Sequence, residues 1–230
     1  MLTAMRDGRF GFDRPDPLRR TLLASVAQAV RLERPYRNWR LTGLFPERVA
    51  AELARLPFAP PPMDAGSGRR EMSNEHRHYF AGDLLTRHPV MGRVAEVFQA
   101  PQVARAFARS TGAKLDGTYL RIEYAVDQDG FWLEPHTDLG VKALSLLVQF
   151  ASEGQAELGT DLYGGPGAWC ERAAFGWNCA LMFVPADNTW HGFEPRLIAG
   201  LRRSVIVNYV TDDWRAREQL AFPDRPLHLP

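Results

Sequence analysis

His136 and Asp138 form a His-x-Asp pair, a residue combination and spacing that can bind a metal. On a β-strand, residues two apart point to the same face, so the imidazole and the carboxylate can converge on one point. Taken alone, the pair fits a surface ion pair equally well. His191 follows the apolar run 180–186, just past the end of an expected buried strand. Two imidazoles and one carboxylate are the ligands of a facial triad, which covers one side of an octahedral iron and leaves three positions open.

A second group of residues with binding chemistry lies in the apolar run 200–210. Arg202 and Ser204 are two positions apart, so they share one strand face, and Arg203 points to the other. Burying a guanidinium and a hydroxyl inside an apolar strand costs free energy unless an acceptor such as a carboxylate bonds to both. We therefore expect Arg202 to anchor an anionic ligand near the metal.

The combination of these motifs is more specific than any one of them. His136-x-Asp138, the distant His191 and Arg202-x-Ser204 together resemble the Fe(II)- and 2-oxoglutarate-dependent dioxygenase superfamily, above all its prolyl-hydroxylase-like branch. The resemblance implies a mainly β fold with N-terminal helices, whose core is a double-stranded β-helix, a cupin-like jelly roll. It also implies three cofactors or co-substrates, namely Fe(II), 2-oxoglutarate and dioxygen.

The resemblance assigns roles to individual residues in the range 118–210. His136, Asp138 and His191 would bind Fe(II), and Arg202 with Ser204 would hold the far carboxylate of 2-oxoglutarate. In this branch a tyrosine on the strand before the His-x-Asp pair often helps to hold the co-substrate. Tyr124 occupies the matching region, and a core tyrosine with a satisfied hydroxyl is the alternative interpretation.

The implied reaction is hydroxylation of a C–H bond, with decarboxylation of 2-oxoglutarate to succinate. Related halogenases have a small residue at the carboxylate position, so Asp138 predicts hydroxylation rather than halogenation. The substrate we expect is a small polar molecule. The segment with His76, Arg77, His78 and Tyr79, together with Arg69 and Arg70, could form a lid that touches it, although a solvated edge strand would carry the same residues.

Two other classes of protein remain open. A cupin-like metal enzyme that does not use 2-oxoglutarate could have the same three ligands, but Arg202-x-Ser204 disfavours it. A non-catalytic β-sandwich that binds sugar or peptide would contain the three residues by accident.

The elements that must position these residues fall into two parts of a single domain, 1–230. Residues 1–116 are expected to be mainly helical support with a lid loop, and residues 215–230 a C-terminal tail. Residues 117–214 should form the β-core, because short β-branched or aromatic runs alternate there with turn signals. Helices are predicted from Asp16-Pro17, from Pro46, over 89–99 and over 101–110, where apolar residues recur at helical spacing.

Composition excludes several classes of protein. The 230 residues are 45% hydrophobic and 24% charged, which is typical of a globular chain. A formal net charge of +1 provides no basic field for nucleic acid. Cys170 and Cys179 form no disulfide framework, and apolar stretches such as 179–186 are less than half a membrane span. We expect a cytoplasmic protein with a small-molecule substrate and no membrane or nucleic-acid partner.

Overall fold

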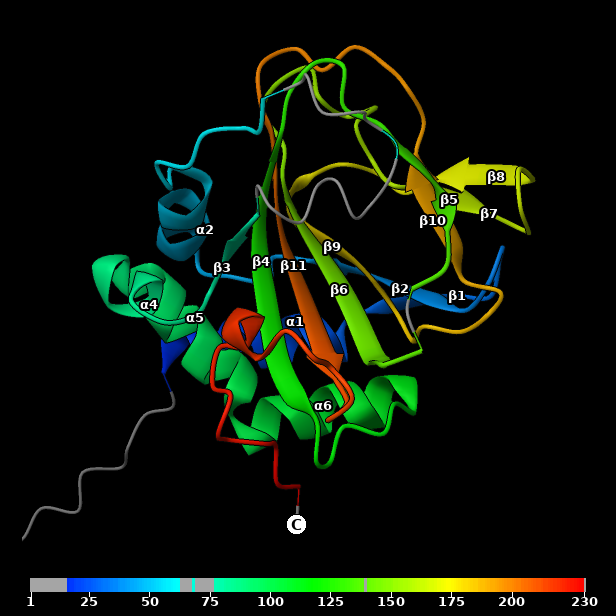
Figure 1. The fold of residues 1–230 in the computed structure, drawn as a ribbon. Coiled ribbons are helices and arrows are strands. Elements are labelled where there is room, and N and C mark those ends of the chain that lie inside the picture. The colour runs from blue at the N-terminus through cyan, green and yellow to red at the C-terminus, as the bar shows by residue number, and fades with distance from the viewer. Residues whose placement is uncertain (1–15, 63–67, 69–76, 139, 230) are drawn as a thin grey trace, which may run out of the picture.

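Two antiparallel sheets form the framework of the protein in a computed structural model that describes residues 16–62, 68, 77–138 and 140–229 (Figure 1). The large sheet has the strand order β1-β2-β9-β6-β11-β4-β3 and the small sheet the order β5-β10-β7-β8. The strands of the large sheet are β1 (Val30–Leu32), β2 (Asn38–Thr42), β3 (His78–Tyr79), β4 (Tyr119–Asp127), β6 (Lys142–Phe150), β9 (Trp177–Phe183) and β11 (Arg202–Val210). Those of the small sheet are β5 (Leu133–His136), β7 (Asp161–Tyr163), β8 (Trp169–Arg172) and β10 (Trp190–Phe193). This arrangement confirms the double-stranded β-helix expected for the core.

The centre of the large sheet is β11, which pairs along its length with β4 on one side and β6 on the other. Its residues alternate in character. Val205, Val207 and Tyr209 face the main hydrophobic core, whereas Arg202 and Asn208 line a pocket between the sheets. Because side chains on a strand alternate with period two, one strand builds both the core and the wall of the pocket.

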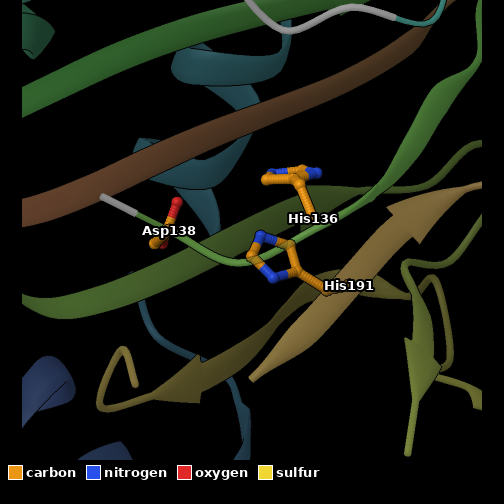
Figure 2. Close-up of side chains that lie close together, drawn as sticks. All are labelled: His136, Asp138 and His191. Carbon is orange, nitrogen blue, oxygen red and sulfur yellow. The ribbon is translucent and has the colours of Figure 1, made fainter. Parts of the chain in front are cut away.

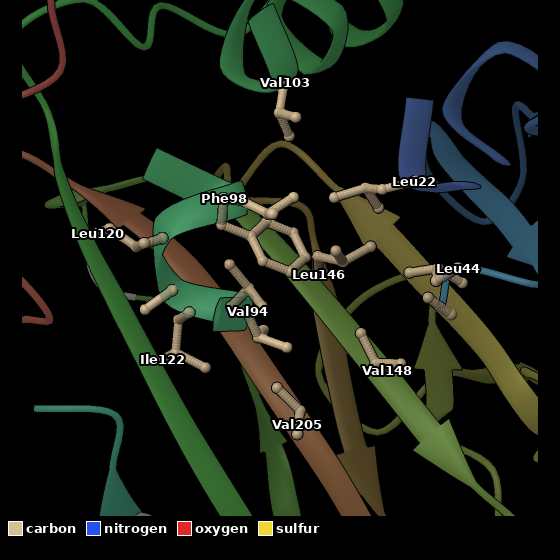
Figure 3. Packing of buried hydrophobic residues seen from close by; sticks show 14 of the residues in the cluster. Leu22, Leu44, Val94, Phe98, Val103, Leu120, Ile122, Leu146, Val148 and Val205 are labelled. Atoms are coloured by element: carbon tan, nitrogen blue, oxygen red, sulfur yellow. The ribbon is translucent and has the colours of Figure 1, made fainter. Parts of the chain in front are cut away.

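Helices cover the outer face of the large sheet. They are α1 (Pro17–Ala27), α2 (Glu47–Ala54), α4 (Leu84–Arg87), α5 (Pro89–Gln99) and α6 (Pro101–Thr111), with a 3-10 turn η1 (Arg217–Gln219) near the C-terminus. Figure 3 shows Val94 and Phe98 of α5 packed against Ile122, Leu146 and Val205 of the sheet. The helices predicted from Pro17 and Pro46 and over 89–99 and 101–110 correspond to α1, α2, α5 and α6.

Helix α1 begins as its sequence indicates. The Asp16 side chain accepts a hydrogen bond from the backbone N–H of Leu18 at 3.1 Å, and Pro17 occupies the first helical position. In the described ranges no helix is both long and apolar enough to cross a membrane.

The N-terminal part contains more strand than the sequence indicated. Strands β1 and β2 were not predicted, and β2 extends the large sheet by pairing with β9, Asn38 opposite Phe183 and Thr42 opposite Cys179. The run NWRLT is short, but its residues alternate between polar and apolar, which is a signal for a strand that the sequence prediction did not use.

Candidate metal centre and its pocket

Three candidate metal ligands lie together at the edge of the small sheet (Figure 2). Strand β5 ends at His136, Asp138 follows it, and His191 lies on the neighbouring strand β10 directly opposite His136. One ligand atom from each side chain lies within 4.8 Å of the other two. The two imidazole rings have centroids 4.4 Å apart.

Backbone carbonyls set the tautomer of both histidines. His136 Nδ1 lies 2.8 Å from the Glu134 carbonyl oxygen, and His191 Nδ1 lies 2.9 Å from that of Thr189. Since a carbonyl can only accept, each Nδ1 carries the proton and each Nε2 carries the lone pair. Metal-binding histidines are oriented in this way, so the donor set fits a divalent cation.

The Asp138 carboxylate is held on both oxygens. Lys142 Nζ donates to Oδ1 and Ser145 Oγ donates to Oδ2, each at 2.6 Å. The Asp138 side chain is only 3% exposed. A carboxylate oxygen has two lone pairs, so these bonds orient the group and leave room for one metal bond.

The three residues border a pocket between the sheets that encloses about 80 Å³, enough for several water molecules. Leu133 and Phe193 of the small sheet and Leu147 and Ile206 of the large sheet provide apolar surface. Arg202 lies at the same pocket, so the structure brings the predicted anion anchor and the predicted metal ligands to one site.

Arg202 already has a counter-ion in the structure. Its Nη1 lies 2.6 Å from Asp127 Oδ2, and its Nε donates to the Leu158 carbonyl at 2.8 Å. The guanidinium carbon lies 5.1 Å and 4.7 Å from the ring centroids of Phe175 and Phe193. Burial lowers the pKa of Arg202, and the Asp127 carboxylate opposes that shift.

Of the other two predicted co-substrate residues, Ser204 has the expected orientation and Tyr124 does not. Ser204 shares the face of Arg202, as expected, and Arg203 lies on the opposite face beside Tyr124. Tyr124 does not reach the pocket: it pairs with Val205, is fully buried in the main core and donates its hydroxyl to the Leu53 carbonyl at 2.8 Å. Burial raises its pKa to about 12, so it stays a neutral donor. The core interpretation of Tyr124 therefore replaces the co-substrate role.

Only part of the expected lid can be compared with the structure. Arg69, Arg70 and His76 lie outside the described residues. His78 pairs with Tyr124 and stacks on Phe58 at 4.0 Å, so it faces the core side of the sheet rather than the pocket.

Sequence reasoning missed several polar residues around the pocket. These are Asp127, Lys142, Ser145 and Asn208. Arg77, which belongs to the segment expected to form a lid, also lines the pocket. Gln149 Nε2 is buried without a hydrogen-bond partner, and its strand position is opposite Ser204. A usable signal was present in the run YLRIEYAVD, where Arg121 and Glu123 interrupt an apolar strand at alternate positions. That spacing indicates a polar inner face.

Comparisons with known proteins found solved structures of similar fold, but no family model and no curated protein with a similar sequence. Among solved structures the chain is similar to a prolyl-4-hydroxylase from Pseudomonas putida, with 11% identity over 84% of this chain and 98% of that chain, at a TM-score of 0.53. A prolyl hydroxylase from Trichoplax adhaerens, solved with a hypoxia inducible factor peptide fragment, also has 11% identity and a TM-score of 0.53, over 86% of this chain and 91% of that chain.

A third similar structure is an oxidoreductase of the 2OG-Fe(II) oxygenase family from Burkholderia pseudomallei. It is 16% identical over 84% of this chain and 90% of that chain, at a TM-score of 0.50. At such identities the likeness is one of fold, and it agrees with the fold that the resemblance implied.

Proposed function

We propose that this protein is a non-haem Fe(II)- and 2-oxoglutarate-dependent oxygenase that hydroxylates a C–H bond of a small polar molecule. The observation that carries the proposal is the convergence of His136, Asp138 and His191 within 4.8 Å at a pocket that also contains Arg202. The neighbours' fold supports it, because the three neighbours named above are prolyl hydroxylases or a 2OG-Fe(II) oxygenase.

The residues present fit an iron ion. His136 and His191 would bind through Nε2 and Asp138 through one carboxylate oxygen, all from one side, as in a facial triad. When bound, Fe(II) with 2-oxoglutarate and dioxygen supplies the oxidising chemistry, and the protein orients the reactants.

The remaining pocket residues would bind the co-substrate and limit water. The Arg202 guanidinium, with Ser204 on the same strand face, would anchor the far carboxylate of 2-oxoglutarate. Phe175 and Phe193 beside the guanidinium exclude water from that end, which strengthens a charge-assisted bond. The charged and amide side chains of the pocket support a polar substrate of small size.

One observation favours a second candidate. Because Arg202 is already paired with Asp127, a cupin-like metal enzyme that uses the same ligands without 2-oxoglutarate would need no further anion. Anaerobic titration of the Fe(II) protein with 2-oxoglutarate separates the two functions. The oxygenase should develop a weak visible charge-transfer band and release succinate in air. A protein that binds Fe(II) but shows neither response would overturn the oxygenase proposal.

We further propose the single-domain organisation with the β-core at 117–214, and a cytoplasmic location. Limited proteolysis and fractionation of cells test these two points. Release of a stable fragment that retains the β-core without α1 and α2 would contradict the first.

A further inference from the structure

A row of buried polar side chains crosses three strands of the large sheet and ends on Asp138. Arg121 on β4 lies opposite Asn208 on β11, which lies opposite Ser145 on β6. Arg121 Nη1 donates to Asn208 Oδ1 at 3.1 Å, Asn208 Nδ2 donates to Ser145 Oγ at 2.9 Å, and Ser145 Oγ donates to Asp138 Oδ2 at 2.6 Å.

The hydrogen bonds in this row all run in one direction. The Asn208 amide must turn its oxygen toward Arg121, since a guanidinium has donors only, and its nitrogen then faces Ser145. Because Ser145 Oγ accepts from Asn208, its single hydrogen is committed to Asp138. Arg121, Asn208 and Ser145 are 2%, 0% and 1% exposed, so little water competes for these bonds.

The far end of the row is held firmly. The Arg121 guanidinium carbon lies 4.8 Å from the ring centroids of both Tyr79 and Trp214. Its Nη2 lies 2.5 Å from Glu123 Oε2, and its Nε donates to Gln219 Oε1 at 2.9 Å. The orientation of Asn208 is therefore anchored by a side chain that is itself fixed by packing and charge.

We propose that Ser145 and Asn208 are positioning residues for the metal-binding carboxylate. Lys142 holds one oxygen of Asp138 and Ser145 the other, so the plane of the carboxylate is set before a metal arrives. Asn208 acts through Ser145, because it determines where the serine hydrogen points. A ligand that is already oriented loses less conformational freedom on binding, which raises metal affinity. This inference rests on the proposed function, since it takes Asp138 to be a metal ligand.

The test measures binding of Co(II) to the apo protein by calorimetry, with no turnover involved. Ser145→Ala and Asn208→Ala should each weaken Co(II) binding by about ten- to a hundredfold, the usual effect of removing such a partner. Ser145→Thr retains the hydroxyl and should bind close to wild type. Arg121 keeps Glu123 and Gln219 in Asn208→Ala, so that variant does not leave a buried charge unpaired.

A matched control separates positioning from general stability. Ser25 on α1 is also a buried serine, and its hydroxyl donates to the Thr42 carbonyl at 2.8 Å, on the helix side of the fold. Ser25→Ala should lower the melting temperature of the apo protein without changing Co(II) affinity. The increase in melting temperature on adding Co(II) should shrink in Ser145→Ala and Asn208→Ala, but not in Ser25→Ala or Ser145→Thr.

The double variant tests whether Asn208 acts through Ser145. Removing both side chains should cost no more Co(II) affinity than removing Ser145 alone, whereas independent effects would add. Additive losses would overturn the role of Asn208. Wild-type affinity in Ser145→Ala would overturn the whole inference and leave the proposed function standing. If the wild-type protein binds no divalent metal, both the proposed function and this inference are wrong.

Discussion

Asp127 Oδ2 lies 2.6 Å from Arg202 Nη1, and Oδ1 of the same carboxylate lies 3.5 Å from Arg77 Nη1. Two guanidiniums therefore share one carboxylate at this end of the pocket. The carboxylate of a ligand bound to Arg202 would complete an alternating row of two cations and two anions. The Asp127 carboxylate and the ligand carboxylate would therefore compete for the Arg202 guanidinium.

Replacement of the proposed anchor should weaken co-substrate binding. Arg202→Ala removes a charge-assisted contact worth about 1.5 to 3 kcal/mol, so 2-oxoglutarate should bind roughly ten- to a hundredfold more weakly. Calorimetry on the Co(II)-loaded protein measures this. Arg203→Ala is the matched control, because Arg203 lies on the opposite face of β11, and its affinity should stay near that of wild type. The reverse pattern would mean that another group anchors the ligand.

Replacement of the internal partner should have the opposite effect. Asp127→Asn leaves a hydrogen-bond acceptor beside Arg202 but removes the competing charge. Since a charged and a neutral hydrogen bond differ by about 1 kcal/mol, 2-oxoglutarate should bind roughly fivefold more tightly. The same calorimetric measurement applies. Weaker binding would show instead that the Asp127 charge is needed to orient the arginine.

Loss of either histidine of the triad should abolish metal binding while the protein stays folded. His136→Ala and His191→Ala each leave two ligands, and succinate release should fall to background. His78→Ala removes a ring that stacks on Phe58 outside the pocket, so it should retain Co(II) affinity. Full turnover by either triad variant would exclude its histidine as a ligand.

The presence of Asp138 predicts an oxygenated product even when chloride is abundant. Halide transfer requires a vacant position on the metal, and the carboxylate of Asp138 would occupy the position that halogenases leave open. Mass spectrometry of products formed in a metabolite extract with high chloride tests this outcome. A chlorine isotope pattern that depends on the native protein and 2-oxoglutarate would refute it.

Asp161 should make stability sensitive to acid. Burial alone would raise the pKa of this carboxyl, but hydrogen bonds from Arg196, the Glu194 backbone N–H and Arg172 outweigh it and hold the pKa below the ordinary 3.8. A carboxyl whose folded pKa is depressed contributes stability above its unfolded pKa, and this is lost as the pH falls through the folded value. The difference in unfolding free energy between wild type and Asp161→Asn should be constant above about pH 5 and shrink below about pH 4. Urea denaturation over that range measures it, and a difference independent of pH would contradict the assignment.

The sequence by itself determined features that depend on neighbours along the chain. Asp16 and Pro17 mark the start of α1, and the spacing of Arg202, Arg203 and Ser204 shows which of them share a face. These predictions need only the period of a helix or a strand, which the local backbone imposes. The motif of His136, Asp138 and His191 likewise identified the candidate ligands, although their mutual approach depends on how β5 pairs with β10.

Only the tertiary structure decided which residues of different strands meet. Tyr124 lies opposite Val205 rather than Ser204, and that single step in register places its ring in the core and away from the pocket. The contacts of Ser145 with Asp138 and Asn208 likewise join residues that no sequence motif links. Register between strands is set by packing of the whole sheet against the helices, and a shift of one residue exchanges the two faces of a strand. Local spacing separates Tyr124 from Arg121 and Glu123 on β4, but it does not tell which residue of β11 lies opposite each of them.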